Sequence, residues 1–179
     1  MADGGLPFEL VTFGPSPHVD ALLSQRPDDL RSLHADGVPK GFPKAHYRTL
    51  PSLSITQDRA GQGMVRFGST VMDGSMALDP ESGEVFELIG RTALRLFVNA
   101  NLRAFTATVH QVSEAFPFYP DGATREQINS AVDATSKLIQ EIDDQAIRPH
   151  DAYWSSFLDD MSMGDWATGA VLDLVSGGY

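Results

Sequence analysis

Between residues 53 and 98, apolar and polar residues alternate over short runs, which is the period of β-strands. Leu53 and Ile55, for example, alternate with serines. Strands are expected around five segments: 53–55, 64–67, 76–78, 85–89 and 94–98. Because short consecutive strands with turn-like links pair most simply with their neighbours, the pattern predicts an antiparallel meander.

The third and fourth of these runs flank Asp79-Pro80-Glu81-Ser82-Gly83, a segment that predicts a tight turn. Proline after aspartate presets a backbone angle found in turns, and glycine supplies a positive φ where the loop closes. Two apolar runs on either side complete the pattern of a β-hairpin.

After the last strand, the apolar period lengthens to that of a helix. Asn99 or Asn101 is the expected N-cap of this first helix. Its apolar residues recur at steps of three and four and so form one stripe. They are Leu102, Phe105, Val109, Val112 and Phe116.

Two more helices are expected towards the C-terminus. The first begins at Thr124, with Gln127 three residues later as its capping-box partner. The second begins after Asp151 and is closed by Gly164. The final residues, 177–179, are expected to fray.

Residues 1 to about 45 are rich in proline and glycine, which interrupt long regular structure. One short helix is expected from Pro27 to His34, because proline suits a first helical turn and Asp28 and Asp29 favour the positive end of the helix dipole. Residues 1–25 form a lead-in for which no element is predicted. The whole chain, 1–179, is expected to be one α+β domain, with helices packed on a central, mainly antiparallel sheet of about five or six strands.

Composition narrows the functional classes. The 179 residues suffice for one sizeable core, and the absence of cysteine excludes disulfides, thiolate catalysis and the usual structural zinc sites. The first residues lack the pattern of a signal peptide, and no run approaches the roughly 18 apolar residues of a membrane span. We therefore expect a cytoplasmic protein that does not act at a membrane.

The formal net charge is −11, and acidic residues are concentrated near the C-terminus. From Gln140 onward, eight acids are accompanied by a single base, Arg148. Such a surface repels phosphate backbones, so direct binding of nucleic acid is not expected. Two explanations remain open: a solubilising surface, or a surface that attracts a basic partner and speeds the encounter.

No catalytic or cofactor-binding constellation is recognisable. The five histidines do not fall at metal-ligand spacing on one element, and no serine lies in a G-x-S-x-G motif. Gly61-Gln62-Gly63 precedes a strand, whereas a dinucleotide site needs a strand before the glycines and a helix after them. No metal, cofactor or catalytic residue is therefore expected, and an enzyme with an unrecognised site remains a lesser alternative.

The acidic pairs Asp143-Asp144 and Asp159-Asp160 could contribute to a functional surface. Adjacent residues on a helix point about 100° apart, so neither pair converges on one metal ion by itself. Three interpretations of these pairs remain open. The acids could simply be solvated, they could form a surface for a basic partner, or they could belong to a metal or acid–base site.

Two tryptophans flank this acidic region. Trp154 shares a helical stripe with Phe157 and Leu158 and is expected in the core. Trp166 follows a glycine and an aspartate, and it is the better candidate for an interface anchor because tryptophan is over-represented at binding hot spots.

Several short segments follow one another in a recognisable order. They are Leu33-His34-Ala35-Asp36-Gly37-Val38-Pro39, Arg66-Phe67-Gly68-Ser69, Met76-Ala77-Leu78-Asp79, Ser82-Gly83-Glu84-Val85, Phe97-Val98-Asn99-Ala100-Asn101-Leu102 with Phe105, Glu141-Ile142-Asp143 through Ala146, and Trp154 to Leu158 with Gly164. In this order the chain resembles the fourth subgroup of the SUKH superfamily of bacterial immunity proteins. Val38 and Asn101 stand where that group usually has leucine and serine, and the resemblance covers roughly residues 30–167.

The resemblance implies an α+β protein that occludes a toxin encoded beside it, typically a nuclease or a nucleic-acid deaminase. Proteins of this family have no known catalytic residues that could be transferred to this chain, so the resemblance implies that the protein is not an enzyme. Together with the acidic C-terminal region, it favours stoichiometric binding of a basic toxin by a monomer or weak homodimer. The alternative is a regulatory or scaffold module of the same superfamily, akin to the fungal cell-wall regulators.

The expected contact residues form two groups. The acidic helical region is the first choice, and the hairpin turn is the second. The first group is Asp143, Asp144, Tyr153, Asp159, Asp160, Asp165 and Trp166, and the second is Asp79, Glu81 and Glu84.

Overall fold

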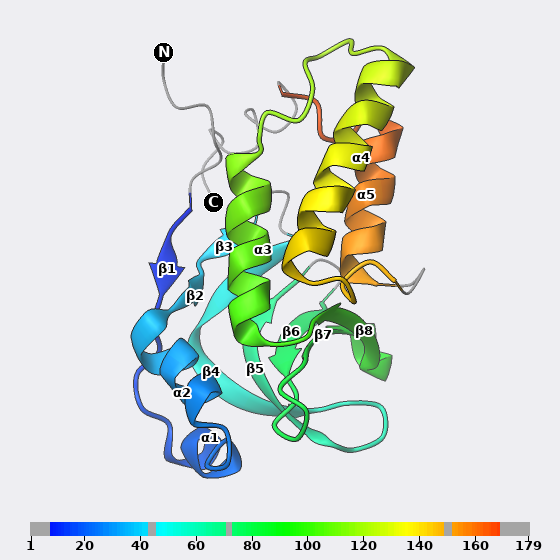
Figure 1. Ribbon diagram of the computed structural model, residues 1–179. Helices are drawn as coiled ribbons and strands as arrows, with labels where there is room; N and C mark the ends of the chain where they lie inside the picture. The colour runs from blue at the N-terminus through cyan, green and yellow to red at the C-terminus, as the bar shows by residue number, and fades with distance from the viewer. Residues whose placement is uncertain (1–7, 43–45, 71–72, 149–151, 169–179) are drawn as a thin grey trace.

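A curled antiparallel sheet carries three long helices on one face, and a smaller two-stranded sheet lies at the N-terminal side (Figure 1). This is a computed structural model, and it describes residues 8–42, 46–70, 73–148 and 152–168. The predicted fold class, α+β with one central antiparallel sheet, is confirmed.

The main sheet has six strands in the order β3-β4-β5-β6-β7-β8, each antiparallel to its neighbours. They are β3 (Gly41–Phe42), β4 (Tyr47–Gln57), β5 (Gly63–Ser69), β6 (Ser75–Leu78), β7 (Val85–Ile89) and β8 (Leu94–Asn99), with a 3₁₀ turn η2 (Gly90–Thr92) before β8. Because each strand pairs with the next one along the chain, the predicted meander is confirmed. β4 is longer than expected, since it continues through Pro51, where its pairing with β5 is irregular.

The turn between β6 and β7 forms as predicted. The N–H of Gly83 donates to the carbonyl of Asp79 at 2.8 Å, and the N–H of Asp79 donates to the carbonyl of Glu84 at 2.9 Å. Gly83 has a φ of +79°, and a Cβ atom there would overlap the guanidinium of Arg26. Glycine therefore suits the backbone angle, and it leaves room for the Arg26 side chain.

The N-terminal elements lie beside the main sheet. Strands β1 (Leu10–Val11) and β2 (Val38–Pro39) pair antiparallel and enclose α1 (Pro17–Leu22), α2 (Pro27–Arg31) and a π-helical turn, η1 (Ser32–Asp36). The helix expected from Pro27 begins where predicted. It changes to π-helical hydrogen bonding at Ser32 and ends at Gly37, whose φ is +88°.

Three helices follow β8. Helix α3 (Leu102–Glu114) is capped by Asn101, whose Oδ1 accepts a hydrogen bond from the Ala104 N–H at 2.8 Å. Helix α4 (Arg125–Ile142) begins with the predicted capping box of Thr124 and Gln127. Helix α5 (Tyr153–Met163) is closed by Gly164 in the left-handed conformation.

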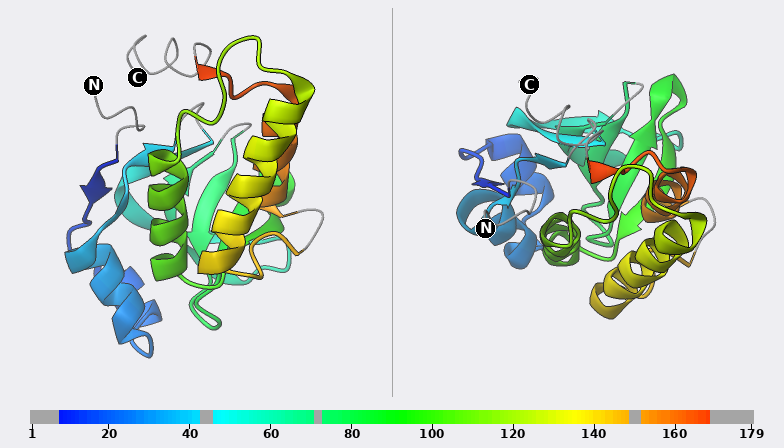
Figure 2. Two further views of the ribbon diagram at one scale, coloured as in Figure 1. Left: turned by 45° about the horizontal axis from the view of Figure 1, so that its top comes forward. Right: turned by 90° about the horizontal axis from the view of Figure 1, so that it is seen from above.

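The main core lies between the sheet and these helices (Figure 2). It also takes up Phe13, Leu23 and Leu33 from the N-terminal elements, so that segment packs as part of the same body. A smaller cluster, made of Met64, Ala77, Leu88, Phe86 and Ala93, covers part of the opposite face of the sheet. Within the described ranges, none of the helices has the length and hydropathy needed to cross a membrane.

Candidate partner-binding surfaces

Three of the predicted acids gather at the C-terminal end of α5. Asp159 and Asp165 are exposed, and Asp160 is partly exposed, with its Oδ2 atom 3.6 Å from Nε2 of His46. Since adjacent helical residues point about 100° apart, Asp159 and Asp160 spread negative charge over a surface. In the part of the chain that the structure describes, no three acidic or histidine side chains are grouped so as to hold a metal ion.

The remaining exposed acids of this region lie at the other end of the helix pair. Nη1 of Arg125, at the start of α4, donates to the carbonyl of Ser162 at 2.6 Å, so the start of α4 meets the end of α5. The two helices are therefore antiparallel, as Figure 1 shows. Asp144, which follows α4 and pairs with Arg148, is separated from the acids of α5 by the length of that helix.

The carboxylate of Asp143, one of the predicted contact residues, is buried and faces inward. It is 7% exposed, and its Oδ2 accepts from the Ala100 N–H at 2.7 Å and from Nδ2 of Asn99 at 3.0 Å. Its Oδ1 accepts from the Gln145 N–H at 3.2 Å. Asn99 also accepts from Nε1 of Trp154 at 3.1 Å. These bonds join β8 to the segment after α4 and to α5, so Asp143 holds the fold together and has little surface for a partner.

Trp166 is another predicted contact residue, and its side chain has no exposed surface. Its ring stacks on Phe42 at 5.4 Å between centroids and meets the edge of Phe157 at 4.7 Å. Its backbone N–H donates to the hydroxyl of Tyr119 at 3.0 Å. The glycine before it ends α5 and turns the chain back onto the core, so Trp166 anchors the C-terminal segment internally. Trp154, by contrast, is in the core as predicted.

Tyr153 is also buried, with 5% of its surface exposed. Burial raises the pKa of its hydroxyl well above its usual range, and the nearby Glu87 carboxyl adds to that rise. Burial also raises the pKa of Glu87, against a hydrogen bond from Thr70 that lowers it. The buried Tyr153 side chain does not offer an apolar anchor to a partner in this conformation.

The hairpin turn contains a further buried carboxylate. Asp79 is 4% exposed, and its Oδ2 accepts from Nη1 of Arg95 at 2.7 Å. Nε of the same guanidinium donates to Oδ2 of Asp58 at 2.7 Å, and Nη2 donates to Oε1 of Gln62 at 2.6 Å. Asp79, a predicted contact residue of the turn, therefore fixes the turn to the neighbouring strand and loop.

The charges of this network support one another. Burial opposes ionisation of Asp58, but hydrogen bonds from the Gln62 N–H and from Arg95 lower the pKa of its carboxyl overall. Burial likewise opposes the charged form of Arg95, while Asp79 and Asp58 raise the pKa of the guanidinium. In the sequence, Arg95 stands between Leu94 and Leu96 with no charged neighbour that would reveal its partners. Its partners lie on other segments and carry no local signal.

The other two residues of the turn remain accessible. Glu81 is exposed and Glu84 is partly exposed. Arg26 steadies the turn from the N-terminal side, since its Nη1 donates to the carbonyl of Glu81 at 3.1 Å. The turn is thus held on both sides and presents two acidic side chains.

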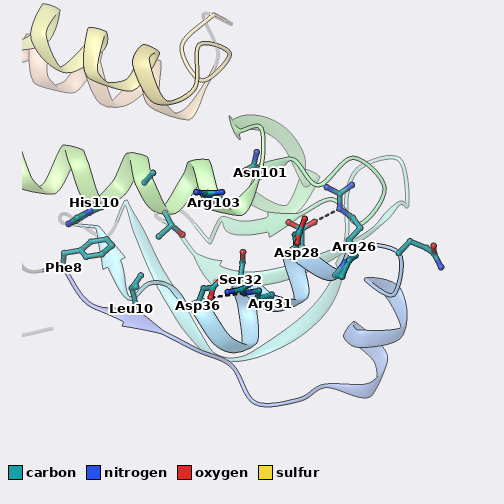
Figure 3. A pocket seen from close by; sticks show the side chains of 16 residues that line it. Phe8, Leu10, Arg26, Asp28, Arg31, Ser32, Asp36, Asn101, Arg103 and His110 are labelled. Carbon is teal, nitrogen blue, oxygen red and sulfur yellow. Dashed lines mark hydrogen bonds and ion pairs between the residues drawn. The ribbon is translucent and has the colours of Figure 1, made fainter.

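A groove of about 1110 Å³ lies between α3 and the segment formed by α2 and η1 (Figure 3). Arg103 and His110 lie on the α3 wall, while Asp28 and Asp36 lie on the opposite wall. At one end the rings of Phe8 and His110 are 4.3 Å apart. The groove was not predicted, because its lining comes from distant segments, and its charges are of both signs.

A family model described as SUKH-4 immunity protein matches residues 8–160, which is most of the chain. Neither the curated proteins nor the solved structures contain a match.

Proposed function

The chain belongs to the SUKH-4 immunity protein family, and from this premise we propose that it neutralises a cognate nuclease or nucleic-acid deaminase toxin by stoichiometric binding through an acidic surface. Enzymes that act on nucleic acids carry basic surfaces that contact phosphates. An acidic protein surface complements such a site and competes with the nucleic acid for it.

The observation that carries this proposal is the group of accessible acids at the end of α5. Asp159, Asp160 and Asp165 lie on and directly after one helix, next to the buried Trp166, which packs against Phe157 of that helix. Because that support is well packed, the charges are presented in a fixed arrangement, and little ordering is needed when a partner binds. The exposed Glu141 and Asp144, at the far end of the helix pair, extend the same negative potential without being part of this group.

Charge reversal tests the proposed surface. The double variant Asp159→Lys/Asp160→Lys should slow association with the toxin domain encoded beside the gene and weaken binding by about tenfold or more. Rates and affinities are measured by surface plasmon resonance over a range of salt concentrations. The wild-type association rate should fall with salt, and the variant should show a shallower dependence.

A control variant with the same change in net charge shows whether lost toxin binding comes from the acids of α5 or from the overall charge of the protein. Asp28→Lys/Asp36→Lys changes the charge by the same amount on the wall of the groove, where both side chains are exposed. Full toxin binding by the α5 variant would exclude this surface. An equal loss in both double variants would mean that overall charge steers the encounter and that no specific acidic contact exists.

The hairpin turn is the second proposed contact, because Glu81 and Glu84 project from a turn held by Arg26 and Asp79. Glu81→Lys/Glu84→Lys should reduce toxin affinity further when it is combined with the α5 variant. Additive losses are expected if the two sites contact the toxin independently.

A further inference from the structure

The two margins of the main sheet differ in how they are protected from pairing with another strand. An unpaired edge presents a row of N–H and C=O groups, and proteins usually block it with proline, bulges or charges. On one margin, β3 pairs only with residues 47–48 of β4. The rest of β4 contains Pro51 and a register shift between Thr49 and Ser54, so this edge is interrupted.

The opposite margin, β8, lacks these features over most of its length. Its sequence, Leu94-Arg95-Leu96-Phe97-Val98-Asn99, has no proline and no lysine. Among the described residues, the backbone groups of residues 94–98 form hydrogen bonds only to β7. Directly before the strand, the Arg59 N–H of the loop between β4 and β5 donates to the carbonyl of Ala93 at 3.1 Å, so the free edge begins at Leu94. In Figure 1, β8 lies on the side of the sheet away from β1 and the N-terminal helices.

The side chains of β8 also leave the edge open. Arg95 is its one charged residue, and its guanidinium is directed to Asp58 and Asp79 instead of to solvent along the edge. Leu94 is 46% exposed, and Leu96 and Phe97 are only partly buried. An apolar edge of this kind, whose one charged side chain is turned toward its own carboxylates, favours addition of another strand.

We propose that β8 pairs antiparallel with β8 of a second copy of this chain, centred on Leu96. That register places Leu96 against Leu96 of the second copy, and each Arg95 opposite Phe97 of the other copy. Arg95 already lies over an aromatic ring on this face, 5.0 Å from the centroid of Phe86, and the Phe86 and Phe97 rings are 5.9 Å apart. The pairing therefore matches leucine with leucine on one face. On the other face it places each Phe97 ring beside Arg95, whose guanidinium stays with Asp58 and Asp79 of its own copy.

The strand limits the strength of this contact. Its pairing with β7 shifts register between Val85 and Phe86, beside Val98, so the regular part of the edge is short. A short edge buries less surface than a stable dimer interface, so the dimer is weak, reversible and dependent on concentration.

Sedimentation velocity over about a hundredfold range of concentration tests the proposal. The wild-type sedimentation coefficient should rise with concentration, and Leu94→Lys should abolish the rise, because a lysine on the edge blocks strand addition. Ile55→Lys is the matched control. Ile55 is 48% exposed on β4, close to the 46% of Leu94, and this variant should still dimerise. A monomeric wild type, or an equal effect of both lysines, would overturn the proposal.

Disulfide trapping tests the register. The chain has no cysteine, so Leu96→Cys introduces the sole thiol. Directly opposite residues of an antiparallel pair have Cβ atoms about 4.5–5.5 Å apart, within reach of a disulfide after small adjustment. Mild oxidation should convert Leu96→Cys, but not Ile55→Cys, to a covalent dimer on a non-reducing gel. Circular dichroism confirms that each variant folds, and a folded Leu96→Cys that stays monomeric would refute this register.

Discussion

At the scale of single residues, the Arg95 guanidinium joins segments that are far apart in the sequence. Asp58 lies 37 positions away and Asp79 lies 16 positions away, and each carboxylate is within 2.7 Å of a guanidinium nitrogen. Two carboxylates brought this close repel each other unless a cation lies between them. Arg95 is therefore the residue on which the geometry of the hairpin turn depends.

Replacing Arg95 should cost much more stability than replacing an exposed arginine. Arg95→Met leaves two carboxylates without their cation and should lower the free energy of unfolding by about 2–4 kcal/mol. Arg31→Met, which removes an exposed pair with Asp36 at 3.4 Å, should cost at most about 1 kcal/mol. Urea denaturation followed by circular dichroism measures both. Equal effects would mean that the network contributes no more than a surface pair.

His34 gives a prediction about pH. Its Nδ1 lies 2.9 Å from the carbonyl of Phe13, and its Nε2 lies 2.9 Å from a carboxylate oxygen of Asp20. Both partners accept hydrogen bonds, so the doubly protonated ring satisfies both. The Phe13 carbonyl and Asp20 raise the pKa of His34 above its usual value, although burial opposes them.

A pKa raised by folding means that His34 stabilises the protein fully below its unfolded value of about 6.5 and loses this contribution as pH rises through the folded value. The stability difference between wild type and His34→Gln should therefore be larger at about pH 6 than at about pH 8.5. Urea unfolding at both pH values measures this difference, and His18→Gln accounts for any general effect of removing a histidine. A difference that is constant or grows with pH would contradict the assignment.

At the scale of elements, local patterns were sufficient for most of the fold. The alternating runs, the Asp79–Gly83 turn and the caps at Asn101 and Thr124 are determined by neighbouring residues, and each formed as predicted. The surface role of Asp143, Tyr153 and Trp166 could not be judged in this way. Their burial depends on Asn99, Phe42 and other residues that folding brings from distant parts of the chain.

The adjacent residues Asp143 and Asp144 test how much these contacts with distant residues contribute to stability, because only Asp143 is buried. Asp143→Ala leaves the Ala100 and Gln145 N–H groups and the Asn99 amide without their acceptor, and should destabilise the protein by about 2–4 kcal/mol. Asp144→Ala removes an exposed pair with Arg148 and should change stability by less than about 1 kcal/mol. Denaturant titrations of the two variants compare them, and a tolerated Asp143→Ala would show that the buried bonds matter little.

At the scale of the whole molecule, the core is continuous from the N-terminal elements to the end of α5. Phe13 and Leu23 belong to the same buried cluster as Phe67, Phe105 and Trp166. The Phe13 N–H donates to the carbonyl of Leu33 at 2.9 Å, so the segment that follows β1 is tied to η1. This continuity supports the prediction of a single domain, because no part of the described chain has a separate core large enough to fold by itself.

A single domain should unfold in one cooperative step. Trp154 and Trp166 are fully buried, so their fluorescence reports the packing between helices and sheet, while far-ultraviolet circular dichroism reports secondary structure. The two signals should give coincident denaturation curves. The amide of Phe13, measured by native-state hydrogen exchange, should be protected nearly as strongly as amides of the central strand β5. An N-terminal segment that exchanges far earlier, with β5 still protected, would show that residues 8–42 are a separately unfolding unit and that the protein is not one cooperative domain.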